Sequence, residues 1–170
     1  PVGFSLALAP GQACYIPVAA SDLKPLPLPT VLRALAGLLE DPSLTLVGQN
    51  IKFDYKVVLQ AGLRMRCRLF DTMVAAWLID SERGSFGMDS LALQHLNYRT
   101  IHYEEAVGEE EGRTLADIPL PAATDYSAED ADITFQLYEL FAPRLRELEL
   151  ERVFQELEMP LVPILADMET

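Results

Sequence analysis

The 170-residue sequence has no apolar run approaching the ~20 residues that a membrane-spanning helix needs. Its two cysteines, Cys14 and Cys67, have no cysteine or histidine partner at metal-ligand spacing, so we expect buried free thiols in a reducing, cytoplasmic compartment. Basic residues are scarce, with 13 Lys and Arg against 26 Asp and Glu and a net charge of −13. Because general nucleic-acid binders carry a basic stripe, this balance argues against broad duplex binding by this chain alone. The acidity fits either a solvated surface or a carboxylate site that holds cations.

Short apolar runs come first in the chain and helical patterns follow. Residues 2–8 and 13–18, separated by Pro10 and Gly11, predict a β-hairpin. The other expected elements are a helix over 30–40 capped by Thr30, a strand over 44–47, a helix over 51–61 capped by Asn50, a brief strand at 69–70, and helices over 71–79, over 88–96 and beyond Pro121. Residues 101–112, rich in glutamate, are expected to form a solvated loop. Early strands followed by helices predict an α/β or α+β domain.

Two pairs of polar residues have the spacing that places side chains on one face of a helix. Asn50 and Asp54 follow a predicted strand, and Tyr126 and Asp130 lie in the long helical region. Residues four apart on a helix are neighbours, so each pair could point into one cleft. Structural interpretations compete, because Asn50 could be only an N-cap and the acids could be first-turn charges at a positive helix end. Spacing alone therefore leaves the role of both pairs open.

Five ordered blocks of the chain resemble the proofreading 3′-5′ exonuclease domain of family A bacterial DNA polymerases. The sequence VGQNIKFD at 47–54 is similar to the second motif of that domain, and YSAEDAD at 126–132 to its third motif, of the tyrosine subtype. FDTM at 70–73 and MDSLA at 88–92 match two further stretches in the same order, and the hairpin at the start resembles the first hairpin. EMPLVP at 158–163 resembles the junction where the polymerase domain begins.

The resemblance implies an α/β fold, a ribonuclease H-like mixed sheet flanked by helices. It also implies an exonuclease domain over residues 1–157 and a junction to, or start of, the polymerase domain over 158–170. The activity implied is removal of mispaired nucleotides from the 3′ end of DNA by two-metal phosphodiester hydrolysis, within an enzyme that polymerises DNA in replication and repair. The implied partners are a single-stranded 3′ end of DNA and the polymerase domain of the same parent chain. No membrane partner is implied, and we expect a monomer.

The residues of the implied site follow from the same motifs. Asp54 and Asp130 would be ligands of Mg²⁺ or Mn²⁺, hard cations that prefer oxygen, and two such ions about 4 Å apart can activate water and offset charge on phosphate. Tyr126 would orient the attacking water, since a phenol stays neutral at pH 7. Substrate-binding roles are implied for Gln49, Asn50 and Tyr103, the last as an aromatic that stacks on a base. Asp71 also recurs in the family pattern, but after a short strand it is interpreted as a helix cap.

The sequence departs from the family at one place. The first motif of the family, Asp-x-Glu on the central strand, belongs just upstream of Pro1, so two of four expected carboxylates are missing and the metal site is incomplete. We therefore expect this chain to be inactive alone. The missing strand would lie between the hairpin and the strand at 44–47, which would leave two strand edges unpaired. An omitted upstream segment, another chain that fills the gap, or a truncated non-catalytic domain would each explain the departure.

Two other functions share most of these features. A ribonuclease D-like exonuclease that trims RNA has the same second and third motifs. A non-catalytic module that braces a polymerase domain would account for the missing Asp-x-Glu, although the intact Asn50/Asp54 and Tyr126/Asp130 pairs count against it.

Overall fold

The computed structural model describes residues 1–22 and 24–169. In chain order the elements are β1 (Gly3–Ala9), β2 (Gln12–Pro17), α1 (Leu28–Leu39), β3 (Thr45–Gly48), α2 (Ile51–Gln60), β4 (Arg68–Asp71), α3 (Thr72–Ile79), α4 (Met88–Leu96), α5 (Tyr103–Val107), the 3₁₀ turn η1 (Leu115–Asp117), α6 (Leu120–Glu147), α7 (Glu151–Val153), the π-helical turn η2 (Phe154–Glu158) and α8 (Met159–Glu169). Within this described part, no helix is both long and apolar enough to cross a membrane.

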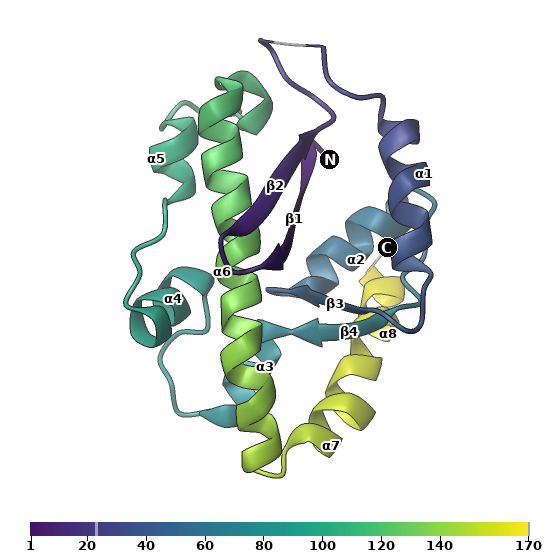
Figure 1. The fold of residues 1–170 in the computed structure, drawn as a ribbon, viewed down its shortest axis with the longest axis vertical. Helices are drawn as coiled ribbons and strands as arrows, with labels where there is room; N and C mark the ends of the chain where they lie inside the picture. Colours follow the sequence, from purple (N-terminus) through teal and green to yellow (C-terminus); the bar gives the residue numbers. More distant parts are fainter. Residues whose placement is uncertain (23, 170) are drawn as a thin grey trace.

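The long helix α6 is the central element of the fold. At about 1.5 Å per residue its 28 residues span roughly 42 Å. In Figure 1 it runs along the long axis, with the strands and α2 on one side and α4 and α5 on the other. Its buried residues recur at helical spacing, at Ile133, Leu137, Phe141 and Leu145, and form part of the main hydrophobic core. This apolar stripe explains why α6 packs against both strand pairs and against α3 and α4.

The strands form two separate pairs. β1 and β2 are antiparallel, joined by a tight turn in which Gly11 has a φ of +72°, a conformation that glycine adopts without strain. β3 and β4 are parallel, with Leu46 opposite Leu69. Among the described residues, no backbone ladder joins β1 to β3. The predicted hairpin, mixed strand directions and flanking helices are confirmed, and the separate pairs fit the expectation that a central strand is missing between them.

Three local expectations are wrong. α1 begins at Leu28, and Thr30 is not its cap, because its N–H donates to the carbonyl of Pro27 at 2.9 Å inside the first turn. The segment predicted as a glutamate-rich loop contains α5, at whose start the Glu105 carboxylate accepts from the N–H of His102 at 3.3 Å. Cys67 is buried as expected, whereas Cys14 is exposed on the hairpin.

Candidate active site

The turn from β3 into α2 is held by a buried carboxylate. Asn50 occupies the N-cap position in the left-handed conformation, with φ 57° and ψ 51°, and its side chain makes no capping hydrogen bond. Instead, Asp71 at the end of β4 accepts from the N–H of Asn50 at 3.0 Å and from the N–H of Ile51 at 2.9 Å. Asp71 thus supplies the acceptor that the Asn50 side chain was expected to supply. Gly48 permits the close approach, since a Cβ there would lie 2.8 Å from Ile51.

Asp71 also caps α3, as the sequence predicts. The same carboxylate accepts from the N–H of Met73 at 2.9 Å and of Val74 at 3.4 Å. Only 2% of the residue is exposed. Burial raises the pKa of Asp71, and the backbone donors of Ile51 and Asn50 oppose that rise. One carboxylate therefore joins the starts of α2 and α3 at the carboxyl ends of β3 and β4.

Asp54 lies one turn into α2 and remains open to solvent on one side. The protein around its carboxyl group still raises the pKa of Asp54 to about 6, with the negative charge of Asp71 as a smaller cause. A carboxyl group with a pKa near neutrality gives up its proton readily when a cation binds. The surroundings of Asp54 therefore disfavour its charged form when no cation is bound.

The amide of Gln49 is already engaged at both ends. Its Nε2 donates to the carbonyl of Phe86 at 2.8 Å, and its Oε1 accepts from the hydroxyl of Thr72 at 2.5 Å. The side chain thus braces β3 against α3 and the loop before α4. Asn50, by contrast, is exposed beside Asp54 on the same turn of α2.

Tyr126 and Asp130 lie one turn apart on α6, close enough for each side chain to shift the pKa of the other. Burial raises the pKa of Asp130 to about 7, the Tyr126 hydroxyl lowers it, and the charges of Glu129 and Asp89 raise it further. Burial and the negative charge of Asp130 also raise the pKa of Tyr126, so the phenol keeps its proton at neutral pH. Tyr126 and Asp130, which the sequence spacing predicts to be neighbours, therefore interact in the fold.

One oxygen of Asp130 has no partner. Oδ1 is buried and makes no hydrogen bond within the part of the chain that the structure describes. Such an orphaned group costs about 1–3 kcal/mol, so it calls for a ligand that compensates it. Carboxylate oxygens are ligands that hard divalent cations prefer.

Tyr103 contacts the Tyr126/Asp130 pair from α5. Its ring lies 5.9 Å from the ring of Tyr126 at an interplanar angle of 75°, an edge-to-face contact, and 41% of the residue is exposed. Its hydroxyl donates to the carbonyl of Arg113 at 3.4 Å. The exposed face of the ring borders the site.

Asp89, at the start of α4, is a residue of this site to which sequence reasoning gave no role. Its carboxylate accepts from the hydroxyl of Thr100 at 2.7 Å and lies 2.9 Å from Nδ1 of His102. Its charge also raises the pKa of both Tyr126 and Asp130. The signal available beforehand was its place in the MDSLA stretch, where the acid resembles a first-turn charge.

The other acids of the third motif support the fold. Glu129 accepts from the N–H of Ile101 and from the hydroxyl of Tyr98, both at 2.7 Å. Asp132 accepts from the N–H of Gly11 at 2.6 Å and so ties the hairpin turn to α6. These contacts favour a structural role for both residues.

The fit of the donor set to a metal is incomplete. Asp54 and Asp130 offer oxygens of the right kind, but no group of three or more His, Cys, Asp or Glu side chains gathers in a metal-binding arrangement among residues 1–22 and 24–169. The acids that shift the pKa of Asp54 and Asp130 also differ, Asp71 for the first and Glu129 and Asp89 for the second. The two carboxylates lie on separate elements, α2 and α6.

The mixed strand directions and the flanking helices give the chain an α/β fold of the ribonuclease H-like kind. Nearly the whole chain superposes on two solved structures with similar folds. A Pol1 polymerase-domain structure from M. smegmatis with DNA primer-template and dNTP has a TM-score of 0.74 at 21% identity, covering 99% of this chain and 25% of that one. Brucella melitensis NrnC with bound Mg²⁺ has a TM-score of 0.65 at 17% identity, covering 98% and 82%.

The profile of the 3′-5′ exonuclease family matches residues 1–146, and the chain belongs to that family. DNA polymerase I of Treponema pallidum is 50% identical over 141 residues, which is 82% of this chain and 14% of that protein. DNA polymerase I of Pseudomonas aeruginosa is 39% identical over 175 residues, which is 99% of this chain and 19% of that protein. The chain thus spans less than a fifth of either relative. The resemblance inferred from the motifs is confirmed at the level of the family.

Proposed function

We propose that the chain is the proofreading 3′-5′ exonuclease domain of a DNA polymerase I, which removes mispaired nucleotides from the 3′ end of a DNA strand. The observation that carries the proposal is the buried Asp130 oxygen that lacks a partner beside Tyr126. The match of the family profile to residues 1–146 supports it. The net charge of −13 is compatible, because such a domain needs to hold only a few single-stranded nucleotides.

Asp54 and Asp130 would hold Mg²⁺ or Mn²⁺, which supply an activated water and neutralise charge on the phosphate. The raised pKa of both groups makes ion binding compete with protons near neutral pH. Tyr126, protonated and fixed by Asp130, would orient the attacking water with its hydroxyl. Two carboxylates do not complete such a centre, so we expect the chain alone to be inactive and its activity to require carboxylates from outside residues 1–170.

Substrate contacts would come from the exposed groups that border the carboxylates. Asn50 presents its amide beside Asp54, and Tyr103 presents a partly exposed ring beside Tyr126. Stacking on an aromatic ring tolerates any base, as removal of any mispaired nucleotide requires. Gln49 would act through its brace on Thr72 and Phe86, which positions the turn that carries Asn50.

The test uses the intact parent polymerase with a labelled primer that ends in a mismatch. Asp54→Asn and Asp130→Asn should each lower nucleotide removal by at least about 10²-fold and leave polymerisation largely unchanged, because they remove cation ligands. Glu139→Gln is the matched control, an exposed acid of the same helix. Proofreading by Asp130→Asn at the wild-type rate would refute the assignment.

The same assay separates the rival functions. A labelled RNA end degraded faster than the DNA end would favour an RNA-trimming enzyme. A structural module would show no saturable Mn²⁺ site that depends on Asp130, in the parent protein as in the chain alone.

We further propose that residues 1–157 form the exonuclease domain and that 158–170 join it to the polymerase domain. α8 buries Met159, Val162 and Ala166 against the rest of the domain, and Lys52 pairs with Glu169 at 2.6 Å. The opposite side of this segment leaves five large apolar residues exposed, at Leu157, Leu161, Ile164, Leu165 and Met168. A further domain would cover such an apolar surface. Residue 170 lies outside the described residues.

A further inference from the structure

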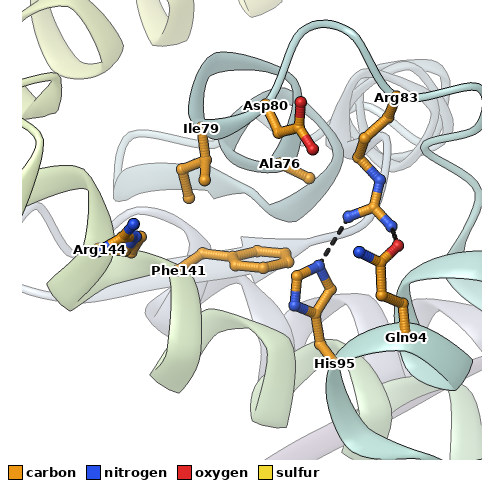
Figure 2. Close-up of a pocket in the computed structure, with 8 residues that line it drawn as sticks. All are labelled: Ala76, Ile79, Asp80, Arg83, Gln94, His95, Phe141 and Arg144. Atoms are coloured by element: carbon orange, nitrogen blue, oxygen red, sulfur yellow. Dashed lines mark hydrogen bonds between the residues drawn. The ribbon is translucent and has the colours of Figure 1, made fainter.

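A concavity lies where α3, α4 and α6 meet, apart from the carboxylates of the candidate active site (Figure 2). Its volume is about 360 Å³, and its apolar floor consists of Ala76, Ile79 and Phe141. Phe141 follows Asp130 by three turns of α6, a rise of about 16 Å. The pocket is therefore not an extension of the Tyr126/Asp130 pair.

The pocket holds a guanidinium whose charge is not neutralised. Arg83 donates to Oε1 of Gln94 and, at 2.7 Å, to Nε2 of His95, and both contacts are visible in Figure 2. Because that nitrogen accepts, His95 is in its neutral form, and burial together with Arg83 lowers the pKa of His95. In the described part of the chain, no carboxylate oxygen lies within 4.0 Å of the Arg83 guanidinium.

A second arginine stands at the opposite rim. Arg144 pairs with Glu147 at 2.9 Å, but both side chains are more than half exposed, so the pair is weak and exchanges easily. Asp80 is the one acidic residue of the lining, which leaves a net charge of +1 in a chain whose net charge is −13. The guanidinium fork matches the geometry of a phosphate group.

The floor adds a flat apolar surface to this charge. The ring of Phe141 lies 5.0 Å from the ring of His95 at an interplanar angle of 88°, and Ala76 and Ile79 are the other apolar residues of the lining. The volume lies within the range of small-ligand pockets, about 300–1,000 Å³. A ligand that combines a phosphate with an aromatic ring fits both halves.

We propose that this pocket binds a nucleotide, with its base against Phe141 and its phosphate attracted by the positive charges of Arg83 and Arg144. Gln94 and Asp80 are placed to contact the base edge or a sugar hydroxyl. The nucleotide is either a free 5′-mononucleotide or a unit of a single strand. The inference rests on the proposed function in one respect, because an exonuclease acts on strands and releases mononucleotides.

The test is calorimetric titration of the purified protein in EDTA, so that no metal contributes and no hydrolysis occurs. Deoxyadenosine 5′-monophosphate should bind saturably. Arg83→Gln and Arg144→Gln should each weaken its binding by about tenfold, since each removes a charged hydrogen-bond donor. Deoxyadenosine and inorganic phosphate should each bind about tenfold more weakly than the nucleotide. Arg152→Gln, which alters an exposed arginine paired with Glu156, is the matched control and should bind as the wild type does.

Asp130→Asn separates this pocket from the candidate active site. Unchanged nucleotide binding in that variant, together with loss in the arginine variants, supports the proposal even if the protein is not an exonuclease. Loss in Asp130→Asn with retention in both arginine variants would place the nucleotide elsewhere and overturn the proposal. Equal binding of phosphate and nucleotide would overturn it as well. A short oligonucleotide that binds more tightly than the mononucleotide, with the same dependence on Arg144, would identify a strand as the source.

Arg83 also ties the loop after α3 to α4, so its variant could unfold locally. Arg144 carries no such tie, because its pair with Glu147 lies within α6. Wild-type affinity in Arg144→Gln, with an unchanged thermal midpoint, would therefore be sufficient to reject the site.

Discussion

Asp71, which is not a proposed ligand, joins two helices through its side chain. Four backbone N–H groups, from α2 and α3, converge on one carboxylate that is 2% exposed. Removing an acceptor from buried donors costs the desolvation of each donor, about 1–3 kcal/mol where no water replaces it. Asp71 is therefore a positioning residue for Asn50 and, through the start of α2, for Asp54.

Asp71→Ala should lower the free energy of unfolding by about 3 kcal/mol, measured by urea denaturation. Asp41→Ala is the control, because the Asp41 carboxylate accepts from Ser43 in an exposed turn, and the substitution should cost less than about 1 kcal/mol. Equal losses of unfolding free energy in the two variants would contradict the proposal that Asp71 holds the starts of α2 and α3 together.

Asp130 should make stability depend on pH in the metal-free protein. The pKa of this carboxyl is about 7 in the folded state against 3.8 for an ordinary Asp, so between these values the folded state holds a proton that the unfolded state has lost. The stability contributed by protonated Asp130 is therefore complete below about pH 4 and is lost as pH rises to 7.

The measurement compares wild type with Asp130→Asn, which cannot titrate, in EDTA. The unfolding free energy of the wild type should fall relative to the variant by more than about 1 kcal/mol from pH 4 to pH 7. Asp125→Asn, at an exposed position of α6, controls for changes in net charge. A difference in unfolding free energy between wild type and Asp130→Asn that stays constant across this range would argue against a buried carboxyl group with a raised pKa.

At the scale of elements, the Asp132 side chain on α6 connects this helix to the turn between β1 and β2, which lies 121 residues earlier in the sequence. Asp132 accepts from the N–H of Gly11 at 2.6 Å and from Nε2 of Gln136 at 2.8 Å. Asp132→Ala should increase amide hydrogen exchange at the turn between β1 and β2, while exchange in α6 stays unchanged. Glu139→Ala, on the exposed side of the same helix, should leave exchange at the turn as it is.

The elements themselves could largely be predicted, because their signals are local. The Pro10-Gly11 turn, the helix over Met88–Leu96 and the cap at Asp71 depend on neighbours within a few residues. The sequence analysis missed α5 although its signal is local, because Glu105 orders the start of this helix through His102 and Arg99, three and six residues before it. Thr30 failed as a cap because Pro29 at the start of α1 allows the helix to begin earlier.

The candidate site divides in the same way. The pairing of Tyr126 with Asp130 follows from helical spacing and is found in the fold. Asp89 and the clasp of Asp71 on Asn50 depend on contacts between segments 20 or more residues apart, which no local pattern encodes. The structural role of Gln49 could not be predicted either, because it depends on the distant residue Phe86, whose carbonyl accepts from the Gln49 side chain.

At the scale of the whole molecule, the two strand pairs share a core without sharing a sheet. β1 and β3 each pair on one side only in the described ranges, and both pack against α6. An unpaired strand edge invites another strand, and one that entered here with two acids would add to Asp54 and Asp130. A single added strand with two acids would therefore pair the open strand edges and also supply further metal ligands.

We therefore expect that joining a strand with an Asp-x-Glu motif ahead of Pro1 will raise both stability and cation affinity. The urea midpoint should rise, amides of β1 and β3 should become protected from exchange, and Mn²⁺ should bind at least about tenfold more tightly, since two carboxylates are added to the centre. The same strand with Asn-x-Gln is the decisive control, because it fills the gap without supplying charge. It should reproduce the protection of β1 and β3 but not the gain in Mn²⁺ affinity. Protection without any difference in Mn²⁺ affinity between the two strands would separate the fold from the metal site and refute Asp54 and Asp130 as ligands of a shared centre.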